Sequence, residues 1–183
     1  ALGISDKISN KALSKFKGTW RRMEYKGMVN NAKIYDDYGH HPTEIKATLQ
    51  AARELMSRNP KSKIRNLKSK LWCIFQPHQY QRTYKLFEKF VSAFDQADKV
   101  VLLPIYSVAG REKESIKRKV SSEMLAKAIK NRNQESRIRN QEVIYLNSFK
   151  KTADYLKKNL KKRDIAVIMG AGDIYQLTEL LVK

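Results

Sequence analysis

The fold is decided by a stretch that passes from a strand through a polar turn into a helix: Ala32-Lys33-Ile34-Tyr35-Asp36-Asp37-Tyr38-Gly39-His40-His41-Pro42-Thr43-Glu44-Ile45. Pro42 suits the first position of a helix because it has no N–H to satisfy there. Glu44 favours the positive end of the helix dipole. The turn between strand and helix holds two acids, a tyrosine and two of the chain's three histidines. A strand followed directly by a helix is the repeating unit of an α/β protein.

The same unit recurs four times further along the chain. Short apolar strands are expected at Leu71–Phe75, Lys99–Tyr106, Val143–Leu146 and Ile165–Met169. The intervals after them show apolar residues at helical spacing, namely Leu86, Phe87, Phe90, Val91 and Phe94; Met124, Leu125, Ala128 and Ile129; Phe149, Ala153, Leu156 and Leu160; Leu177, Leu180 and Leu181. This alternation predicts an α/β, Rossmann-like fold: a mostly parallel sheet with helices on both faces.

The first part of the chain follows a different pattern. Residues 6–17 predict an amphipathic helix, with Gly18 as its stop, and nothing nearby in the sequence would cover its apolar side. We expect this helix to finish a preceding domain and the chain, which starts Ala-Leu-Gly, to be a piece of a longer protein. Asn30-Asn31 predicts a tight turn, and the polar stretch 58–69 predicts a loop.

Composition narrows the function classes. No apolar run approaches the roughly 18 residues that a bilayer span requires, and no signal peptide pattern is present, so a cytoplasmic location is expected. The single cysteine, Cys73, lies in an apolar run and predicts a buried small side chain. The net charge of +20 indicates either a nucleic-acid partner or a lysine-rich surface. The basic helices lack the interleaved aromatic residues of a base-stacking platform. This favours a lysine-rich surface over a nucleic-acid partner as the explanation of the charge.

Three polar turns follow predicted strands, at residues 36–44, 76–83 and 170–173. In parallel sheets, ligands bind beyond the carboxyl ends of the strands. We therefore expect the three turns to line one edge, called here the strand-end rim.

Several kinds of site can be weighed on this rim. Gly170-Ala171-Gly172 could approach a phosphate or could serve close packing, and the dinucleotide fingerprint is missing. A metal site is disfavoured because His40 and His41 are adjacent and point apart. No nucleophile elbow supports serine catalysis. His78 and Arg82 lie four residues apart, where an arginine fork could hold a carboxylate or a phosphate. Alternatively, the same residues could have a purely structural role as helix caps or in ion pairs.

Four motifs, taken in chain order, resemble those of a known protein family. They are Gly18-Thr19-Trp20-Arg21-Arg22-Met23-Glu24; the stretch 36–45; Gln76-Pro77-His78-Gln79-Tyr80-Gln81-Arg82-Thr83; and Met169-Gly170-Ala171-Gly172-Asp173-Ile174. Together they resemble the C-terminal part of the Mur ligases, specifically the members that add L-alanine to UDP-N-acetylmuramate in peptidoglycan synthesis. The resemblance covers essentially the whole chain.

The resemblance implies a three-domain enzyme. Residues 1–19 would end the central ATP-binding domain and residues 20–183 would form the C-terminal domain, which brings the amino acid and closes over ATP. ATP, with Mg²⁺ bound mainly by the central domain, would convert the carboxylate of UDP-N-acetylmuramate to an acyl phosphate, which the amine of L-alanine attacks. The piece alone would be inactive, and no metal ligand or catalytic residue is expected in it.

Site residues carry over by position. The resemblance implies that Arg22 and Asp37 hold ATP, and that L-alanine is surrounded by Tyr38, His40, His78 and Arg82. The chain departs from the family pattern at Gln79, where arginine is usual, and at Gln81, where serine is usual. Arg82 is then the remaining guanidinium for the carboxylate.

Two other functions compete with this one. A related ligase that recycles murein tripeptide shares the region around Asp37 but lacks the Gln76-Pro77-His78 run. A basic nucleic-acid-binding module would belong to a different class, and we rank it below the ligases.

Overall fold

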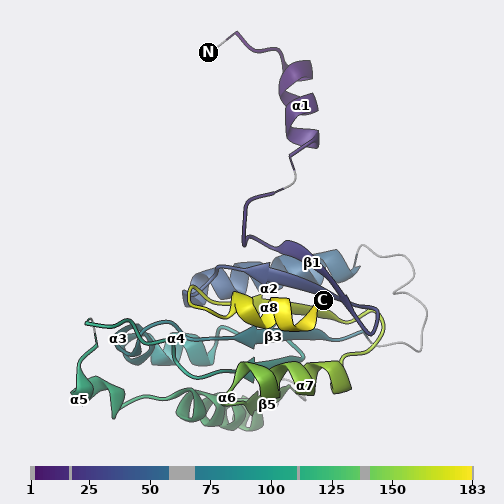
Figure 1. The fold of residues 1–183 in the computed structure, drawn as a ribbon. Helices are drawn as coiled ribbons and strands as arrows, with labels where there is room; N and C mark the ends of the chain where they lie inside the picture. Colours follow the sequence, from purple (N-terminus) through teal and green to yellow (C-terminus); the bar gives the residue numbers. More distant parts are fainter. Residues whose placement is uncertain (1–2, 17, 58–68, 111, 137–140, 183) are drawn as a thin grey trace.

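The computed structural model describes residues 3–16, 18–57, 69–110, 112–136 and 141–182. Within these ranges the chain forms a six-stranded sheet in the order β1-β2-β6-β3-β4-β5 (Figure 1). The strands are β1 (Glu24–Val29), β2 (Ala32–Asp37), β3 (Leu71–Phe75), β4 (Lys99–Leu102), β5 (Glu142–Tyr145) and β6 (Ile165–Met169). β1 pairs antiparallel with β2, and the other pairings are parallel. The predicted α/β fold with a mostly parallel sheet is confirmed.

The last strand of the chain takes a central place in the sheet. β6 inserts between β2 and β3, so that Asp37 pairs with Met169 and Met169 pairs with Phe75. The carboxyl ends of these three strands therefore lie side by side. The polar turns that follow them form the strand-end rim, as the sequence pattern predicts.

Helices cover both faces of the sheet. They are α2 (Pro42–Ser57), α3 (Tyr80–Lys85), α4 (Phe87–Val91), α5 (Glu114–Lys117), α6 (Ser122–Ser136), α7 (Phe149–Asn159) and α8 (Tyr175–Leu181). In β3, Leu71, Cys73 and Phe75 pack in one cluster with α2, α4 and α6. Trp72 and Ile74 point to the other face, in a cluster with α7 and α8. Each large apolar side chain buried in this way contributes about 1.5–3 kcal/mol to the stability of the fold. The core on both faces of the sheet therefore holds in place the strands that carry the rim.

Several local details depart from the sequence predictions. The helix predicted at residues 6–17 ends at Ser14. The strand predicted at 99–106 ends at Leu102, since Pro104 has no N–H to continue a ladder. The helix predicted around residues 86–94 is two short helices separated at Leu86, whose φ of −109° is not helical. α5 was not predicted. The turn at Asn30 and Asn31 is confirmed, with φ of 52° and 62°. Nearly all of the loop predicted at 58–69 lies outside the described residues.

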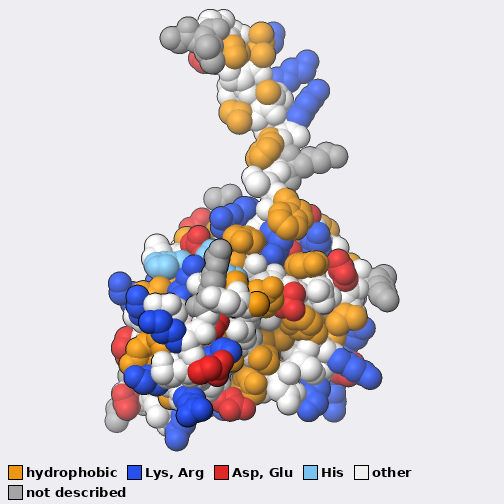
Figure 2. Space-filling view, turned by 60° about the vertical axis from the view of Figure 1, so that its left-hand side comes forward, with side chains coloured by type: hydrophobic (Ala, Val, Ile, Leu, Met, Phe, Trp, Pro, Cys, Tyr) orange, Lys and Arg blue, Asp and Glu red, His pale blue; other side chains and the backbone are white. Residues whose placement is uncertain are grey.

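The N-terminal helix α1 (Asp6–Ser14) stands away from the sheet, as Figure 1 shows. None of its residues is buried, and Ile8, Leu13 and the nearby Phe16 are each more than 60% exposed. Hydrophobic side chains are visible on its surface in Figure 2. Among the described segments, no helix combines the length and apolarity needed to cross a membrane.

Candidate functional site

The rim brings together four side chains that are dispersed in the sequence. The ring centroids of Tyr38 and His40 are 5.4 Å apart, and those of His40 and His78 are 5.8 Å apart. His78 also stacks on Tyr106, at 5.4 Å and an interplanar angle of 12°. Arg82 Nη1 lies 3.3 Å from His78 Nδ1. The residues predicted around L-alanine therefore form one continuous group. Tyr106 joins it from the loop after β4. The available signal was that Tyr106 is a polar aromatic residue at the end of the strand predicted at 99–106.

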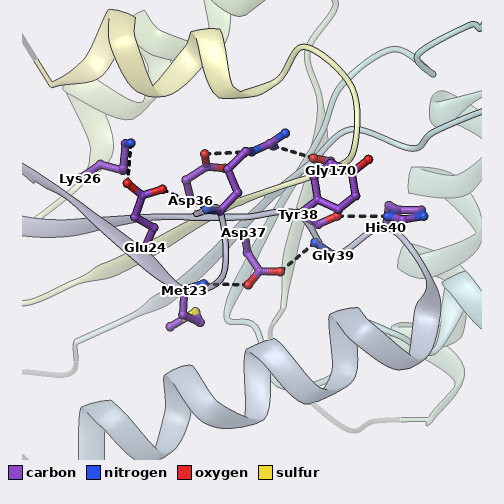
Figure 3. A network of polar contacts seen from close by, with 10 residues as sticks. Met23, Glu24, Lys26, Asp36, Asp37, Tyr38, Gly39, His40 and Gly170 are labelled. Atoms are coloured by element: carbon purple, nitrogen blue, oxygen red, sulfur yellow. Dashed lines mark hydrogen bonds and ion pairs between the residues drawn. The ribbon is translucent and has the colours of Figure 1, made fainter. Parts of the chain in front are cut away.

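Asp37 shapes the turn that carries this group. It is buried, and its carboxylate accepts hydrogen bonds from the backbone N–H of Gly39 at 2.8 Å and of Met23 at 2.9 Å (Figure 3). The Thr48 hydroxyl lies 3.3 Å from the same carboxylate. A Cβ at Gly39 would lie 2.7 Å from Asp37 Oδ1 and 3.0 Å from Met169 Cε, so a larger residue here would displace the hydrogen-bonded carboxylate. Asp37 thus ties the segment before β1 to the end of β2.

A buried ion pair lies beneath the rim, between Arg21 and Asp36. The Arg21 Nε atom is 3.0 Å from Asp36 Oδ2, and Nη2 donates to the Gly170 carbonyl at 2.6 Å. Burial raises the pKa of Asp36, and the neighbouring Arg21 guanidinium opposes that rise. The pair joins the ends of β2 and β6.

Sequence reasoning did not foresee the buried ion pair of Arg21. Arg22 is exposed, and its guanidinium lies 5.8 Å from the centroid of the Tyr38 ring. Two adjacent arginines look alike in the sequence, and which one turns inward depends on the fold of the turn before β1. The adjacent acids Asp36 and Asp37 were a signal that one arginine could be paired inside.

Glu44 organises the start of α2. Its Oε2 accepts the backbone N–H groups of His40 at 2.8 Å and His41 at 3.0 Å. Burial would raise the pKa of Glu44, but these two donors, with the electrostatic influence of the nearby His40 and Arg22 side chains, bring it below its ordinary value. An ionised carboxylate is therefore held beside the His40 ring, with 3.6 Å between Glu44 Oε2 and His40 Nδ1.

His78 is held in its neutral form. Burial, then the positive charge of Arg82, then His40 lower the pKa of His78, with Glu112 acting in the opposite direction. A neutral imidazole and a guanidinium side by side can both donate hydrogen bonds to one anion.

The glycine-rich turn after β6 serves close packing. A Cβ on Gly170 would lie 2.8 Å from the Gln76 carbonyl oxygen, and a Cβ on Gly172 would lie 2.6 Å from Tyr106 Cγ. Gln76 Nε2 donates to Asp173 Oδ1 at 2.9 Å across the same contact. Of the two readings of this turn, packing against the β3 end is the one that the contacts support.

A metal centre does not fit the rim. In the part of the chain that the structure describes, no group of three or more His, Cys, Asp or Glu residues could hold a metal ion. Acidic side chains of the rim, such as Asp36, Asp37 and Glu44, are bonded to the protein itself.

Fold and rim together define an α/β domain that gathers histidine, arginine and tyrosine side chains at the carboxyl ends of its strands, where ligands bind in folds of this class. The chain belongs to the Mur ligase family, since the family profile described as "Mur ligase, glutamate ligase domain" matches residues 21–172.

Individual relatives agree with this assignment. The UDP-N-acetylmuramate–L-alanine ligase of Clostridium tetani is 43% identical over 183 residues, which are 100% of this chain and 35% of the relative. The crystal structure of the UDP-N-acetylmuramate-alanine ligase of Thermotoga maritima shares the fold, with a TM-score of 0.71 and 23% identity, over 99% of this chain and 33% of that one. The crystal structure of a murein peptide ligase of Psychrobacter arcticus gives a TM-score of 0.62 with 24% identity, over 98% of this chain and 33% of that one. The chain spans about a third of the length of these proteins.

Proposed function

We propose that the chain is the C-terminal domain of an ATP-dependent ligase that joins L-alanine to UDP-N-acetylmuramate in peptidoglycan synthesis. The observation that carries this proposal is the 43% identity, over the whole chain, to a relative of that name. The rim supports it, because an amino acid offers a carboxylate to arginine and histidine donors. In the proposed reaction the carboxyl group of UDP-N-acetylmuramate is first activated as an acyl phosphate, and the amine of L-alanine then displaces phosphate.

In this proposal the amino acid lies among Tyr38, His40, His78 and Arg82. The Arg82 guanidinium and the His78 ring, 3.3 Å apart, hold the carboxylate. Tyr38 and His40, whose ring centroids are 5.4 Å apart, complete the set of side chains around the amino acid. The task of these side chains is positioning, since an activated acyl group needs an amine at the right distance and angle.

In the same proposal, Arg22 and Asp37 contribute to the binding of ATP. The exposed Arg22 guanidinium is available to the phosphates of ATP. Asp37 contributes by fixing the Met23 backbone, directly after Arg22, with a 2.9 Å hydrogen bond. Because the described residues offer no metal site, we assign Mg²⁺ to another domain of the longer protein.

The domain division follows the same proposal. Residues 1–19 end the central ATP-binding domain, and residues 20–183 form the C-terminal domain. The exposed apolar residues Ile8, Leu13 and Phe16 support this division, because apolar side chains at helical spacing need a partner surface. The rim is then one half of an active site, and UDP-N-acetylmuramate and ATP reach it from the other domains.

The test compares the full-length protein with residues 1–183 as a separate chain. With ATP, Mg²⁺, UDP-N-acetylmuramate and L-alanine, the full-length protein should form the amide product and the separate chain should form none. Product from murein tripeptide, with none from L-alanine, would replace the proposal by the tripeptide-recycling ligase. Absence of ligase activity, together with tight and salt-sensitive DNA or RNA binding in gel shifts at two salt concentrations, would replace it by a nucleic-acid-binding function.

A single substitution tests the carboxylate site. Arg82→Ala in the full-length protein should raise the KM for L-alanine far more than the KM for ATP, because in this proposal the lost guanidinium binds the amino acid and not the nucleotide. Equal increases in both constants would contradict the assignment of Arg82 to the carboxylate.

A further inference from the structure

The two histidines of the rim present different nitrogen atoms to a ligand. His40 Nδ1 lies 3.1 Å from the Tyr38 carbonyl oxygen. A carbonyl oxygen can only accept a hydrogen bond, so Nδ1 carries the proton. In the neutral ring, His40 Nε2 is then a free lone pair that can accept a proton.

His78 has the opposite arrangement. Its Nδ1 lies 3.3 Å from Arg82 Nη1, and a guanidinium only donates hydrogen bonds. His78 Nδ1 is therefore an acceptor, and the proton of the neutral ring is on Nε2. Burial and the Arg82 charge lower the pKa of His78, which keeps the ring in this state. The rim thus holds one imidazole that accepts and one that donates, with ring centroids 5.8 Å apart.

We propose that His40 Nε2 takes a proton from the ammonium group of the incoming amino acid while His78 and Arg82 hold its carboxylate. This inference rests on the proposed ligase function and adds a catalytic residue to it. An ammonium group has no lone pair and cannot attack a carbonyl carbon, so a proton acceptor beside the amine is required.

The surroundings of His40 suit a proton acceptor. The Tyr38 carbonyl fixes the ring through Nδ1, and the Glu44 carboxylate, 3.6 Å from the same nitrogen, stabilises the imidazolium that forms. This is the arrangement of a base oriented by a third group. The Tyr38 carbonyl and Glu44 are positioning groups, since in this proposal they act through the His40 ring.

The step balances as follows. The ammonium group of the amino acid gives one proton to His40 Nε2, and the freed lone pair on nitrogen forms the bond to the acyl carbon. The bond between that carbon and the phosphate oxygen breaks, and its electron pair leaves with the phosphate. The remaining excess proton on nitrogen passes to the phosphate, which leaves as hydrogen phosphate. His40 later returns its proton to water.

Titratable and charged groups surround His40. Glu44 faces it from α2, and His78 faces it from the turn after β3. Arg82 and Glu112 act on His78, and Arg22 acts on Glu44. A pH profile of kcat therefore carries contributions from these groups together, and the difference between the wild-type protein and a His40 variant isolates the contribution of His40.

The experiment uses the full-length protein with His40→Asn. An asparagine amide can still donate to the Tyr38 carbonyl, but it places no acceptor where Nε2 was. With L-alanine, kcat should fall about 100-fold or more with little change in the KM for L-alanine, and the acidic limb of kcat against pH should be lost. With hydroxylamine, which is already neutral at pH 7, hydroxamate should form from the acyl phosphate at the wild-type rate. In His40→Ala, added imidazole should restore part of kcat.

Two matched controls accompany it. His41→Asn changes the adjacent histidine, whose Nδ1 accepts the Thr43 N–H at 3.3 Å, and should leave kcat close to wild type. His78→Gln keeps an N–H donor and should change the KM for L-alanine more than kcat.

Each contrary result has its own meaning. If the wild-type protein forms product while His40→Asn keeps its kcat and its acidic limb, the inference is wrong and the proposed function stands. If His40→Asn loses hydroxamate formation as well, the residue is needed before the amine reacts, and the inference is also wrong. If the wild-type protein forms no product from L-alanine, the proposed function fails and the inference fails with it.

Discussion

Replacing Arg21 by methionine should lower the free energy of unfolding by about 3–5 kcal/mol, the cost of removing one partner of a buried ion pair. The side chains of Arg21 and Asp36 are both 2% exposed, and Nε is 3.0 Å from the carboxylate. The Gly170 carbonyl loses its 2.6 Å hydrogen bond in the same change. Methionine retains most of the apolar volume, so the loss reports the charge and the hydrogen bonds. Against a total stability of about 5–15 kcal/mol for a domain, this is a large fraction.

The stability lost in Arg21→Met should increase as the pH rises. Burial already raises the pKa of Asp36 in the presence of Arg21, and removing the guanidinium raises it further. A carboxyl group whose folded pKa lies above its unfolded value stabilises the fold at low pH and loses this contribution as pH rises through the folded pKa. The deficit of Arg21→Met relative to the parent should therefore be smaller at about pH 5 than at about pH 8.

The assay is urea unfolding of the 183-residue chain, followed by circular dichroism at both pH values. Arg22→Met is the matched control, because it makes the same substitution at the adjacent, exposed arginine, and it should change stability by no more than about 0.5 kcal/mol. Equal losses at the two positions, or an Arg21→Met deficit that is the same at both pH values, would refute the reasoning.

Three further predictions concern the rim and the core. Gly172→Ala should cost about 1–3 kcal/mol by overpacking, because its Cβ would meet Tyr106 Cγ at 2.6 Å; urea unfolding measures this, and an unchanged midpoint would contradict the packing role of the glycine. The lowered pKa of Glu44 means that its contribution to stability is present above the unfolded pKa and is lost as pH falls through the folded pKa. Glu44→Gln should therefore reduce stability at neutral pH and flatten its acid dependence in a pH series. Cys73 is buried and burial raises the pKa of its thiol, so iodoacetamide should label it slowly in the native chain and rapidly in urea; fast native labelling would show that the core opens.

Local physical signals were sufficient for much of the fold. Apolar runs bounded by polar turns located β3 and β6 with their observed ends, Leu71–Phe75 and Ile165–Met169. Pro42 begins α2 as its missing N–H predicts. Two boundaries were misjudged. The β4 strand ends at Leu102, for which Pro104 was a signal already present in the sequence, and the region around Leu86 forms two helices instead of one.

By itself, the sequence determined the α/β class, the three polar turns and the side chains available for an anionic ligand, because these depend on periodicity and on residue chemistry within a few positions. Only the tertiary structure decided that β6 enters between β2 and β3, since strand order is set by packing between residues far apart in the chain. The same holds for Arg21 turning inward rather than Arg22, because the Gly170 carbonyl that it reaches is far away in the chain. The proton positions of His40 and His78 are set by partners only two and four residues away, the Tyr38 carbonyl and Arg82. The fold decides that the two rings lie next to each other, because they follow different strands.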